Sequence, residues 1–187
     1  MTRIIAGVAG VERREQRLAH PVARRARARS RRRAQRSTAR DAVRGSRVLD
    51  LYAGSGALGL EAASRGAASV VLVESDRRAA DVIARNIRDL GLAGVQVLRS
   101  AVGALLAAEP GPSDAADLVL VDPPYDVDED ALAVVLRRLG AGWLAPGGLV
   151  VVERSTRSPE PTWPDGIRRE VEPRKYGETT IWYATRD

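Results

Sequence analysis

The strongest structural signal in this chain lies in Val48-Leu49-Asp50-Leu51-Tyr52-Ala53-Gly54-Ser55-Gly56-Ala57-Leu58-Gly59. A short apolar run that holds one acid leads into a turn with three glycines. This pattern predicts a buried parallel strand, a loop whose backbone approaches a ligand closely, and the start of a helix. We therefore expect a nucleotide-like ligand at this turn.

The acids around the turn favour S-adenosylmethionine over a dinucleotide. A dinucleotide loop presents bare N–H groups to a pyrophosphate, and a nearby carboxylate would repel that charge. Asp50 stands just before Gly54, which suits a ligand with a cationic end, such as an ammonium or a sulfonium. Glu74 ends the next apolar run, 20 residues after Gly54, where a carboxylate can hold both ribose hydroxyls. A nucleotide-sugar or dinucleotide-binding oxidoreductase is the alternative from another class.

Strand-like and helix-like segments alternate from Val48 onward. Apolar runs predict strands at 48–51, 69–74, 95–98, 118–121 and 149–152, and helical patterns lie at 57–65, between Asp76 and Gly91, at 101–108 and at 129–139. The final runs, 167–171 and 179–184, have no helix between them and predict an antiparallel hairpin. The predicted fold class is α/β and Rossmann-like, with a mostly parallel seven-stranded sheet that binds ligands at its carboxyl edge.

Composition excludes several kinds of site. The chain has 187 residues, no cysteine and one histidine, His20. Disulfides, thiolate nucleophiles and zinc-thiolate sites are therefore excluded, a lone histidine argues against a Ser-His-Asp triad, and we predict no metal. No apolar run approaches the roughly 20 residues that span a bilayer, and no signal-peptide pattern opens the chain. We predict a soluble, cytoplasmic monomer without a membrane partner.

The positive charge is concentrated in one segment. Residues 11–44 hold 13 arginines against Glu12, Glu15 and Asp41, whereas the rest of the chain is net negative. Such a block is either an arm that binds nucleic acid or a disordered tail. We assign residues 1–45 to an N-terminal strand, Met1 to Gly10, followed by a poorly ordered arginine-rich arm, and residues 46–187 to the α/β domain.

A second motif, Asp122-Pro123-Pro124-Tyr125, directly follows the fourth predicted strand, on the same sheet edge as the glycine turn. Its prolines fix the backbone, so that the Asp122 carboxylate and the Pro123 carbonyl point into the cleft. Two such acceptors would hold both hydrogens of a planar amino group and aim the nitrogen lone pair at a sulfonium methyl. Tyr125 would stack on the base. The motif indicates methyl transfer to an exocyclic amine.

With both motifs in place, the chain resembles the bacterial 16S ribosomal RNA guanine-N2 methyltransferases of the small subunit. The resemblance covers residues 1–10 and about 46–184, and it rests on Met1 to Gly10, Asp50 to Leu60, Asp122 to Tyr125 and Lys175 to Thr179. It implies a class I S-adenosylmethionine-dependent methyltransferase fold and S-adenosylmethionine as methyl donor. It also implies methylation of one guanine N2 amine in 16S ribosomal RNA, free or in the small-subunit particle.

The predicted site residues fall into two groups. For cofactor binding we predict Asp50, Tyr52, Ala53, Gly54, Gly56, Glu74, Ser75, Ala101 and Asp122, and for catalysis Asp122, Pro123, Pro124 and Tyr125. The chain departs from the family at Ser100-Ala101, where many relatives have an acid, so backbone groups near Ala101 would hold the adenine. Residues 11–44 also depart from the family pattern. A pair of compensating frame errors and a native arm that grips RNA phosphates both explain them.

Within the same chemistry, an adenine-N6 methyltransferase of DNA or RNA would use the same tetrapeptide. A glutamine-N5 protein methyltransferase would carry Asn at position 122, where this chain has Asp122. An RNA-binding relative with an impaired catalytic site is the third alternative.

Overall fold

The computed structural model describes residues 43–111 and 113–187. The strand predicted from Met1 to Gly10 and nearly all of the arginine-rich segment, residues 11–44, lie outside the described residues. Within the described ranges, no helix is both long enough and apolar enough to cross a membrane.

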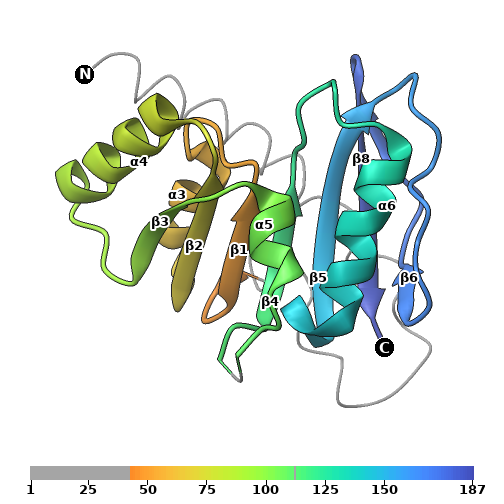
Figure 1. Ribbon diagram of the computed structural model, residues 1–187, viewed down its shortest axis with the longest axis horizontal. Coiled ribbons are helices and arrows are strands. Elements are labelled where there is room, and N and C mark those ends of the chain that lie inside the picture. Colours follow the sequence, from red (N-terminus) through yellow and green to blue (C-terminus); the bar gives the residue numbers. More distant parts are fainter. Residues whose placement is uncertain (1–42, 112) are drawn as a thin grey trace.

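A sheet of eight strands runs through the described part of the chain (Figure 1). The strands are β1 (Arg47–Leu51), β2 (Ser69–Glu74), β3 (Val95–Arg99), β4 (Ala116–Val121), β5 (Leu144–Ser155), β6 (Ile167–Arg169), β7 (Arg174–Tyr176) and β8 (Thr179–Arg186). Their order is β3-β2-β1-β4-β5-β8-β6, and β7 also pairs with β8. β1 to β5 are mutually parallel, and β8 is antiparallel to β5. From β1 the chain adds β2 and β3 on one side, and it then adds β4 and β5 on the other side of β1. Open α/β sheets bind ligands where the strand order switches sides in this way, which here is between β1 and β4.

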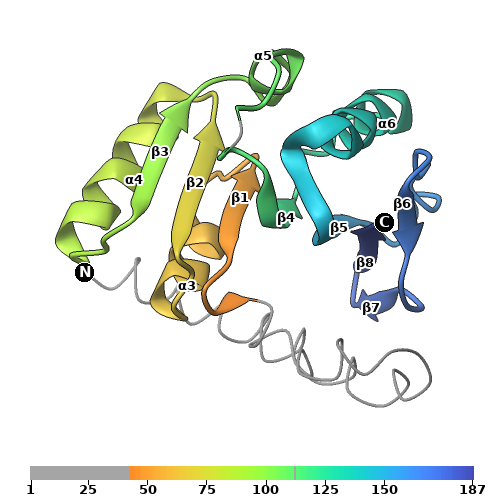
Figure 2. The same cartoon turned by 90° about the horizontal axis from the view of Figure 1, so that it is seen from below.

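Helices cover both faces of this sheet (Figure 2). α3 (Ala57–Ser64) and α4 (Arg77–Asp89) lie on one face, and α5 (Val102–Ala107) and α6 (Glu129–Arg138) lie on the other. A π-helical turn, η2 (Leu139–Trp143), follows α6. Buried aliphatic side chains fill both interfaces, among them Leu60, Leu72 and Ile83 under the first pair and Leu51, Val121 and Leu136 under the second. The two apolar layers hold the sheet rigid at the site.

Side-chain caps fix where the longer helices begin. The carboxylate of Asp76 accepts a hydrogen bond from the Ala79 N–H at 2.8 Å, at the start of α4. The carboxylate of Asp128 accepts one from the Ala131 N–H at 2.8 Å, at the start of α6. Each cap satisfies an N–H that the first helical turn leaves without a partner.

The predicted α/β architecture, with a mostly parallel sheet ending in an antiparallel hairpin, is confirmed. The described sheet has one strand more than the seven predicted. β5 occupies one side of β8 from Thr179 to Thr185, so β6 and β7 lie end to end along its other side. Pro173 lies between them, and a proline has no N–H to donate to a ladder, which accounts for the interruption of this outer strand.

Candidate functional site

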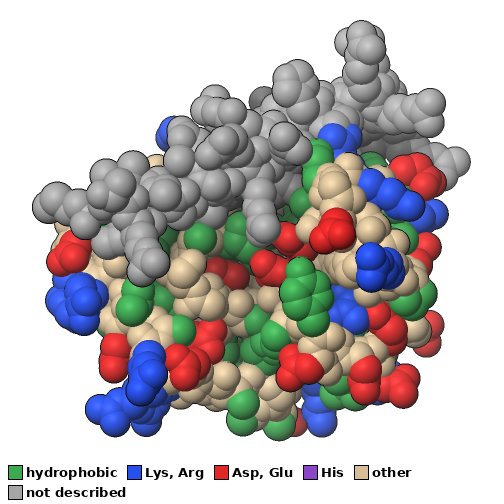
Figure 3. Space-filling view, turned by 90° about the horizontal axis from the view of Figure 1, so that it is seen from above, with side chains coloured by type: hydrophobic (Ala, Val, Ile, Leu, Met, Phe, Trp, Pro, Cys, Tyr) green, Lys and Arg blue, Asp and Glu red, His purple; other side chains and the backbone are tan. Residues whose placement is uncertain are grey.

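A cleft of about 1020 Å³ opens at the carboxyl edge of the sheet. Its walls contain all the predicted site residues except Gly56, which is buried beneath the loop against Ile83 and Leu72. Figure 3 looks onto this edge and shows acidic side chains around the middle of the face, with Lys and Arg side chains mainly toward its periphery. The cleft is at the upper end of the size range of small-molecule sites, so it has room for a cofactor and a base.

Strand register brings the two sequence motifs together. Leu51 of β1 is paired with Val121 of β4, so the glycine turn and the tetrapeptide leave the sheet at the same level. Val121 is in turn paired with Val152 of β5, which adds Glu153 at that level. Asp122 therefore lies on the same edge as the glycine turn, and both line one cleft.

Asp50 is the most buried acid of the cleft, with 1% of its surface exposed. Its Oδ2 accepts a hydrogen bond from the Gly59 N–H at 2.8 Å. Burial raises the pKa of the Asp50 carboxyl to about 7, and the nearby charges of Asp122 and Glu74 add to this rise, while the Gly59 hydrogen bond opposes it. A cationic ligand beside Asp50 would favour its ionised form.

Glu74 holds the glycine turn against the end of β2. Its Oε2 accepts a hydrogen bond from the Gly54 N–H at 2.7 Å, and its Oε1 accepts one from the Asp76 N–H at 2.8 Å. The Ser75 hydroxyl also donates to Oε1, at 3.4 Å. A carboxylate offers about four acceptor positions, so Oε2 can still accept from a hydroxyl of a ribose. The structure thus gives Glu74 a role in shaping the loop besides the predicted role in binding.

Tyr52 turns the chain sharply where β1 ends. Its φ angle is 61°, and among the described residues it is the only one other than glycine with a positive φ. This conformation is costly for a residue with a side chain, and such strained residues cluster at functional sites. Burial raises the pKa of the Tyr52 hydroxyl, and the charge of Arg154 opposes the rise. Sequence reasoning placed Tyr52 in the site without foreseeing this strain.

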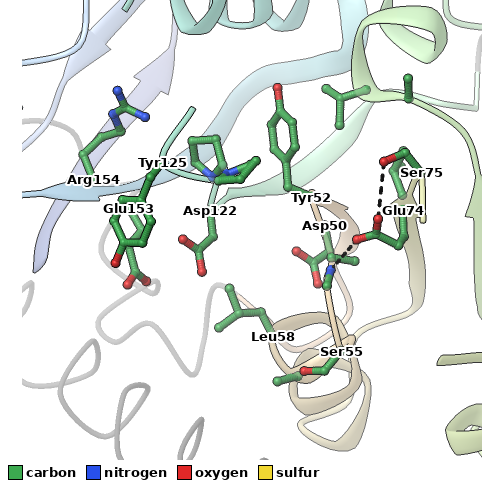
Figure 4. A pocket seen from close by; sticks show the side chains of 18 of the residues that line it. Asp50, Tyr52, Ser55, Leu58, Glu74, Ser75, Asp122, Tyr125, Glu153 and Arg154 are labelled. Carbon is green, nitrogen blue, oxygen red and sulfur yellow. Dashed lines mark hydrogen bonds between the residues drawn. The ribbon is translucent and has the colours of Figure 1, made fainter. Parts of the chain in front are cut away.

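The side chains divide the cleft into two halves (Figure 4). Glu74 and Ser75 lie on one side, Asp50 lies between, and Asp122 and Tyr125 lie on the other side. Pro123 is buried, which fixes the backbone behind Asp122, whereas Tyr125 is 96% exposed at the mouth. The first half suits an adenosine, and the second half suits a planar base that enters from solvent.

Sequence reasoning missed the wall that β5, β8 and the residues next to them supply, which consists of Glu153, Arg154, Ser155, Ser158, Glu178 and Thr179. Glu153 follows the apolar run 149–152 just as Glu74 follows the apolar residues 70–73, so the same reasoning applied to the fifth predicted strand would have found it. Glu178 and Thr179 reach the cleft because Ser155 of β5 is paired with Thr179 of β8. That antiparallel pairing leaves no local sequence signal.

Five of the lining residues are acids, namely Asp50, Glu74, Asp122, Glu153 and Glu178. Within the described ranges, no group of three or more histidine, cysteine, aspartate or glutamate side chains is arranged to hold a metal ion. A cleft of this charge attracts a cationic ligand. The residues therefore fit a ligand that joins an adenosine to a positively charged end.

Comparisons with known proteins agree with this geometry. The family model described as "Conserved hypothetical protein 95" matches residues 2–185. "Ribosomal RNA small subunit methyltransferase D" of Escherichia coli (strain K12) is 36% identical over 121 residues, which are 64% of this chain and 58% of that protein. This chain therefore matches less than two thirds of the length of that relative.

Solved structures show the same fold. "Putative methyltransferase yhhF" from Escherichia coli superposes with a TM-score of 0.70 at 30% sequence identity, over 78% of each chain. The "putative methylase HI0767" from Haemophilus influenzae superposes with a TM-score of 0.67 at 27% identity, over 77% of this chain and 88% of that one.

Proposed function

Because this chain belongs to the conserved hypothetical protein 95 family, whose model spans residues 2–185, we propose that it methylates the N2 amine of a guanine in 16S ribosomal RNA with S-adenosylmethionine as donor. One observation carries the proposal. The Asp122 tetrapeptide lies in the same cleft as Asp50 and Glu74, the two acids suited to an adenosine with a cationic end. The name of the Escherichia coli relative, a small-subunit ribosomal RNA methyltransferase, supports the substrate class.

The cofactor half of the cleft fits the proposed donor. Glu74 faces the cleft, and its Oε2 has an acceptor position left for a ribose hydroxyl. Asp50 supplies a negative charge between the two halves, where the charged end of the donor would lie. When bound, S-adenosylmethionine would supply an electrophilic methyl group. The two electrons of the broken C–S bond stay on the sulfur, and the amine lone pair forms the new N–C bond.

The substrate half of the cleft prepares the amine. The Asp122 carboxylate and the Pro123 carbonyl accept hydrogen bonds from the two N–H groups of the guanine N2 amine. These two bonds aim the nitrogen lone pair at the methyl carbon. As the N–C bond forms, one amine proton leaves to Asp122 or to water. Tyr125 stacks on the face of the base, as recognition of single unstacked bases usually requires. Asp122 is thus a catalytic residue, and Tyr125 holds the substrate.

Turnover on small subunits that lack the methyl group tests the proposal. We expect the full chain to form N2-methylguanine at one position, located by mass mapping of the ribosomal RNA. Asp122→Asn should lower the rate by about 10² to 10³, the usual effect of removing one preorganised polar group. Asp126→Asn is the matched control, because Asp126 is an exposed acid of the same loop that does not line the cleft.

Other products would contradict the proposal in distinct ways. Methyl groups on adenine N6 would identify the alternative enzyme with the same tetrapeptide. Binding of S-adenosylmethionine without turnover would identify the impaired RNA-binding relative. Binding of a dinucleotide in its place would point to the oxidoreductase.

A further inference from the structure

Glu153 lies beside the amine-binding residue Asp122 and has no role in the reaction described above. We propose that the Glu153 carboxylate accepts the N1–H of the target base, and that this contact makes the cleft specific for guanine. The inference rests on the proposed function and adds to it the residue that selects the base.

The position of Glu153 follows from the sheet. Val121, the last residue of β4, is paired in register with Val152 of β5. Asp122 directly follows the end of β4, and Glu153 is the next residue of β5. Neighbouring strands lie about 4.8 Å apart, and level residues on them point to the same face. Both side chains line the cleft. Figure 4 draws Glu153, Asp122 and Tyr125 on the same side of it.

Two adjacent carboxylates match the edge of guanine and mismatch that of adenine. Guanine presents two neighbouring donors on its Watson–Crick edge, the N2 amine and the N1–H, whereas adenine presents its N6 amine beside an N1 lone pair. An ionised carboxylate only accepts hydrogen bonds. If Asp122 holds the amine, Glu153 gains a hydrogen bond from guanine N1–H and repels the N1 lone pair of adenine. Enzymes that act on extruded bases commonly read this edge.

The other lining acids are less suited to this contact. Glu74 lies across the cleft, and its oxygens accept hydrogen bonds from the Gly54 and Asp76 amides. Glu178 comes from the turn between β7 and β8. It is therefore not on a strand paired with β4, whereas pairing of β5 with β4 places Glu153 level with Asp122. Arg154 follows Glu153 but pairs with Glu129 of α6. Since a carboxylate has about four acceptor positions, Glu153 can keep a partner within the protein and still accept from a base.

An analogue of guanine separates base selection from catalysis. In 2,6-diaminopurine the reacting amine at C2 is retained, but N1 carries a lone pair in place of the hydrogen. We would assemble small subunits whose RNA has either guanine or 2,6-diaminopurine at the mapped target position. The ratio of kcat/KM for the two substrates is measured for the wild type, for Glu153→Gln and for Glu178→Gln.

We expect the wild type to prefer guanine. The side-chain amide introduced by Glu153→Gln can donate to N1 of the analogue, so the preference should fall by about 10- to 100-fold or reverse, as for loss of one hydrogen bond to a charged group. Glu178→Gln, which removes another cleft carboxylate, should keep the wild-type ratio. Binding of the two particles without methyl donor should show the same ranking of the variants.

Several results would overturn the inference. If Glu153→Gln lowers kcat/KM equally for both substrates, or changes neither, Glu153 does not select the base, although the proposed function stands. If the wild type methylates no guanine at all, the proposed function fails and the inference fails with it. A urea unfolding curve shows that each variant is folded before its ratio is interpreted.

Discussion

The carboxylate of Asp50 accepts a hydrogen bond at 2.8 Å from the backbone N–H of Gly59, the third residue of α3. The N-cap of this helix is Gly56, which has no side chain to satisfy that N–H. Asp50 therefore caps α3 from the end of β1 and joins the strand, the glycine turn and the helix into one unit. Since Asp50 also lines the cleft, one carboxylate shapes the loop and faces the cleft.

The pKa of Asp50, raised to about 7, predicts a pH-dependent affinity for S-adenosylmethionine. The cationic ligand binds best when Asp50 is ionised, so affinity should fall by about tenfold between pH 8 and pH 6. Titration calorimetry at pH 6, 7 and 8 measures this. Asp50→Asn should bind S-adenosylmethionine more weakly. Because this variant has no carboxyl to titrate at position 50, its pH profile of affinity reports only the titration of the ligand and serves as the baseline. Parallel profiles for the two proteins would contradict the prediction.

The same pKa predicts that the ligand-free protein loses stability as pH rises. The Asp50 carboxyl has a pKa near 3.8 when exposed and about 7 when folded, so between these values only the folded state keeps the proton. The free energy of unfolding should therefore fall with increasing pH over this window, by roughly 1 kcal/mol per unit, and level off above it. Urea unfolding from pH 4 to pH 8 tests this. The difference between wild type and Asp50→Asn isolates the contribution of Asp50, and a constant difference would refute it.

Gly59 is predicted to be intolerant of any side chain. A Cβ at this position would lie 2.8 Å from Leu72 Cδ2 and 3.0 Å from Asp50 Oδ2. Because Leu72 is fully buried, Gly59→Ala should destabilise the protein by about 1–3 kcal/mol and weaken ligand binding. Gly103→Ala is the control for the loss of stability alone, since a Cβ at Gly103 in α5 meets nothing within 4 Å but Gly103 lines the cleft. Alanine favours a helix over glycine, so this control should be neutral or slightly stabilising. Equal losses in both variants would exclude the packing explanation.

The two motifs could be found from the sequence because each is local. Val48 to Gly59 contains the strand, the turn and the helix start, and Asp122 to Tyr125 follows its strand directly. In a parallel α/β sheet, residues that follow strands meet at one edge, so their shared cleft could be predicted as well. What remained hidden was the capping role of Asp50, which depends on how closely α3 approaches the end of β1.

The wall from β5 and β8 depends on pairing between distant segments. β8 lies between β5 and β6 in the sheet, although it comes last in the chain. Apolar periodicity identifies strands but not their partners, so nothing near Glu178 or Thr179 indicates that they reach the cleft. The interruption of the outer strand at Pro173 is hidden for the same reason, because the apolar pattern there predicts only a single hairpin.

The ion pair between Arg154 and Glu129 is predicted to anchor the loop that leads from Asp122 into α6. Arg154 Nη2 lies 2.5 Å from Glu129 Oε1, with the two side chains 9% and 33% exposed, and it joins the end of β5 to the start of α6. Glu129→Gln would leave the largely buried guanidinium without its counter-charge, so we expect a loss of about 1–3 kcal/mol in the free energy of unfolding. Urea unfolding measures it, with Arg154→Met and the double variant completing a cycle.

The exposed pair between Arg77 and Asp81 of α4 is the matched control, with N···O 3.9 Å and side chains 79% and 67% exposed. Asp81→Asn should cost less than about 0.5 kcal/mol, as is usual for surface pairs. Similar costs for Asp81→Asn and Glu129→Gln, or a double variant whose loss equals the sum of the single losses, would show that the Arg154 pair does not couple β5 to α6.

Tyr125 is predicted to act on the substrate and not on the fold. Since the side chain is 96% exposed, Tyr125→Ala should change the free energy of unfolding by less than about 0.5 kcal/mol and leave the affinity for S-adenosylmethionine unchanged. Stacking of a base on an aromatic ring contributes about 1–3 kcal/mol, so kcat/KM on undermethylated small subunits should fall by roughly 10- to 100-fold. Tyr125→Phe keeps the ring and should retain most of the activity, and Val134→Ala, at another exposed apolar residue, should have no effect. A Tyr125→Phe variant as impaired as Tyr125→Ala would mean that the hydroxyl, not the ring, is what the substrate requires.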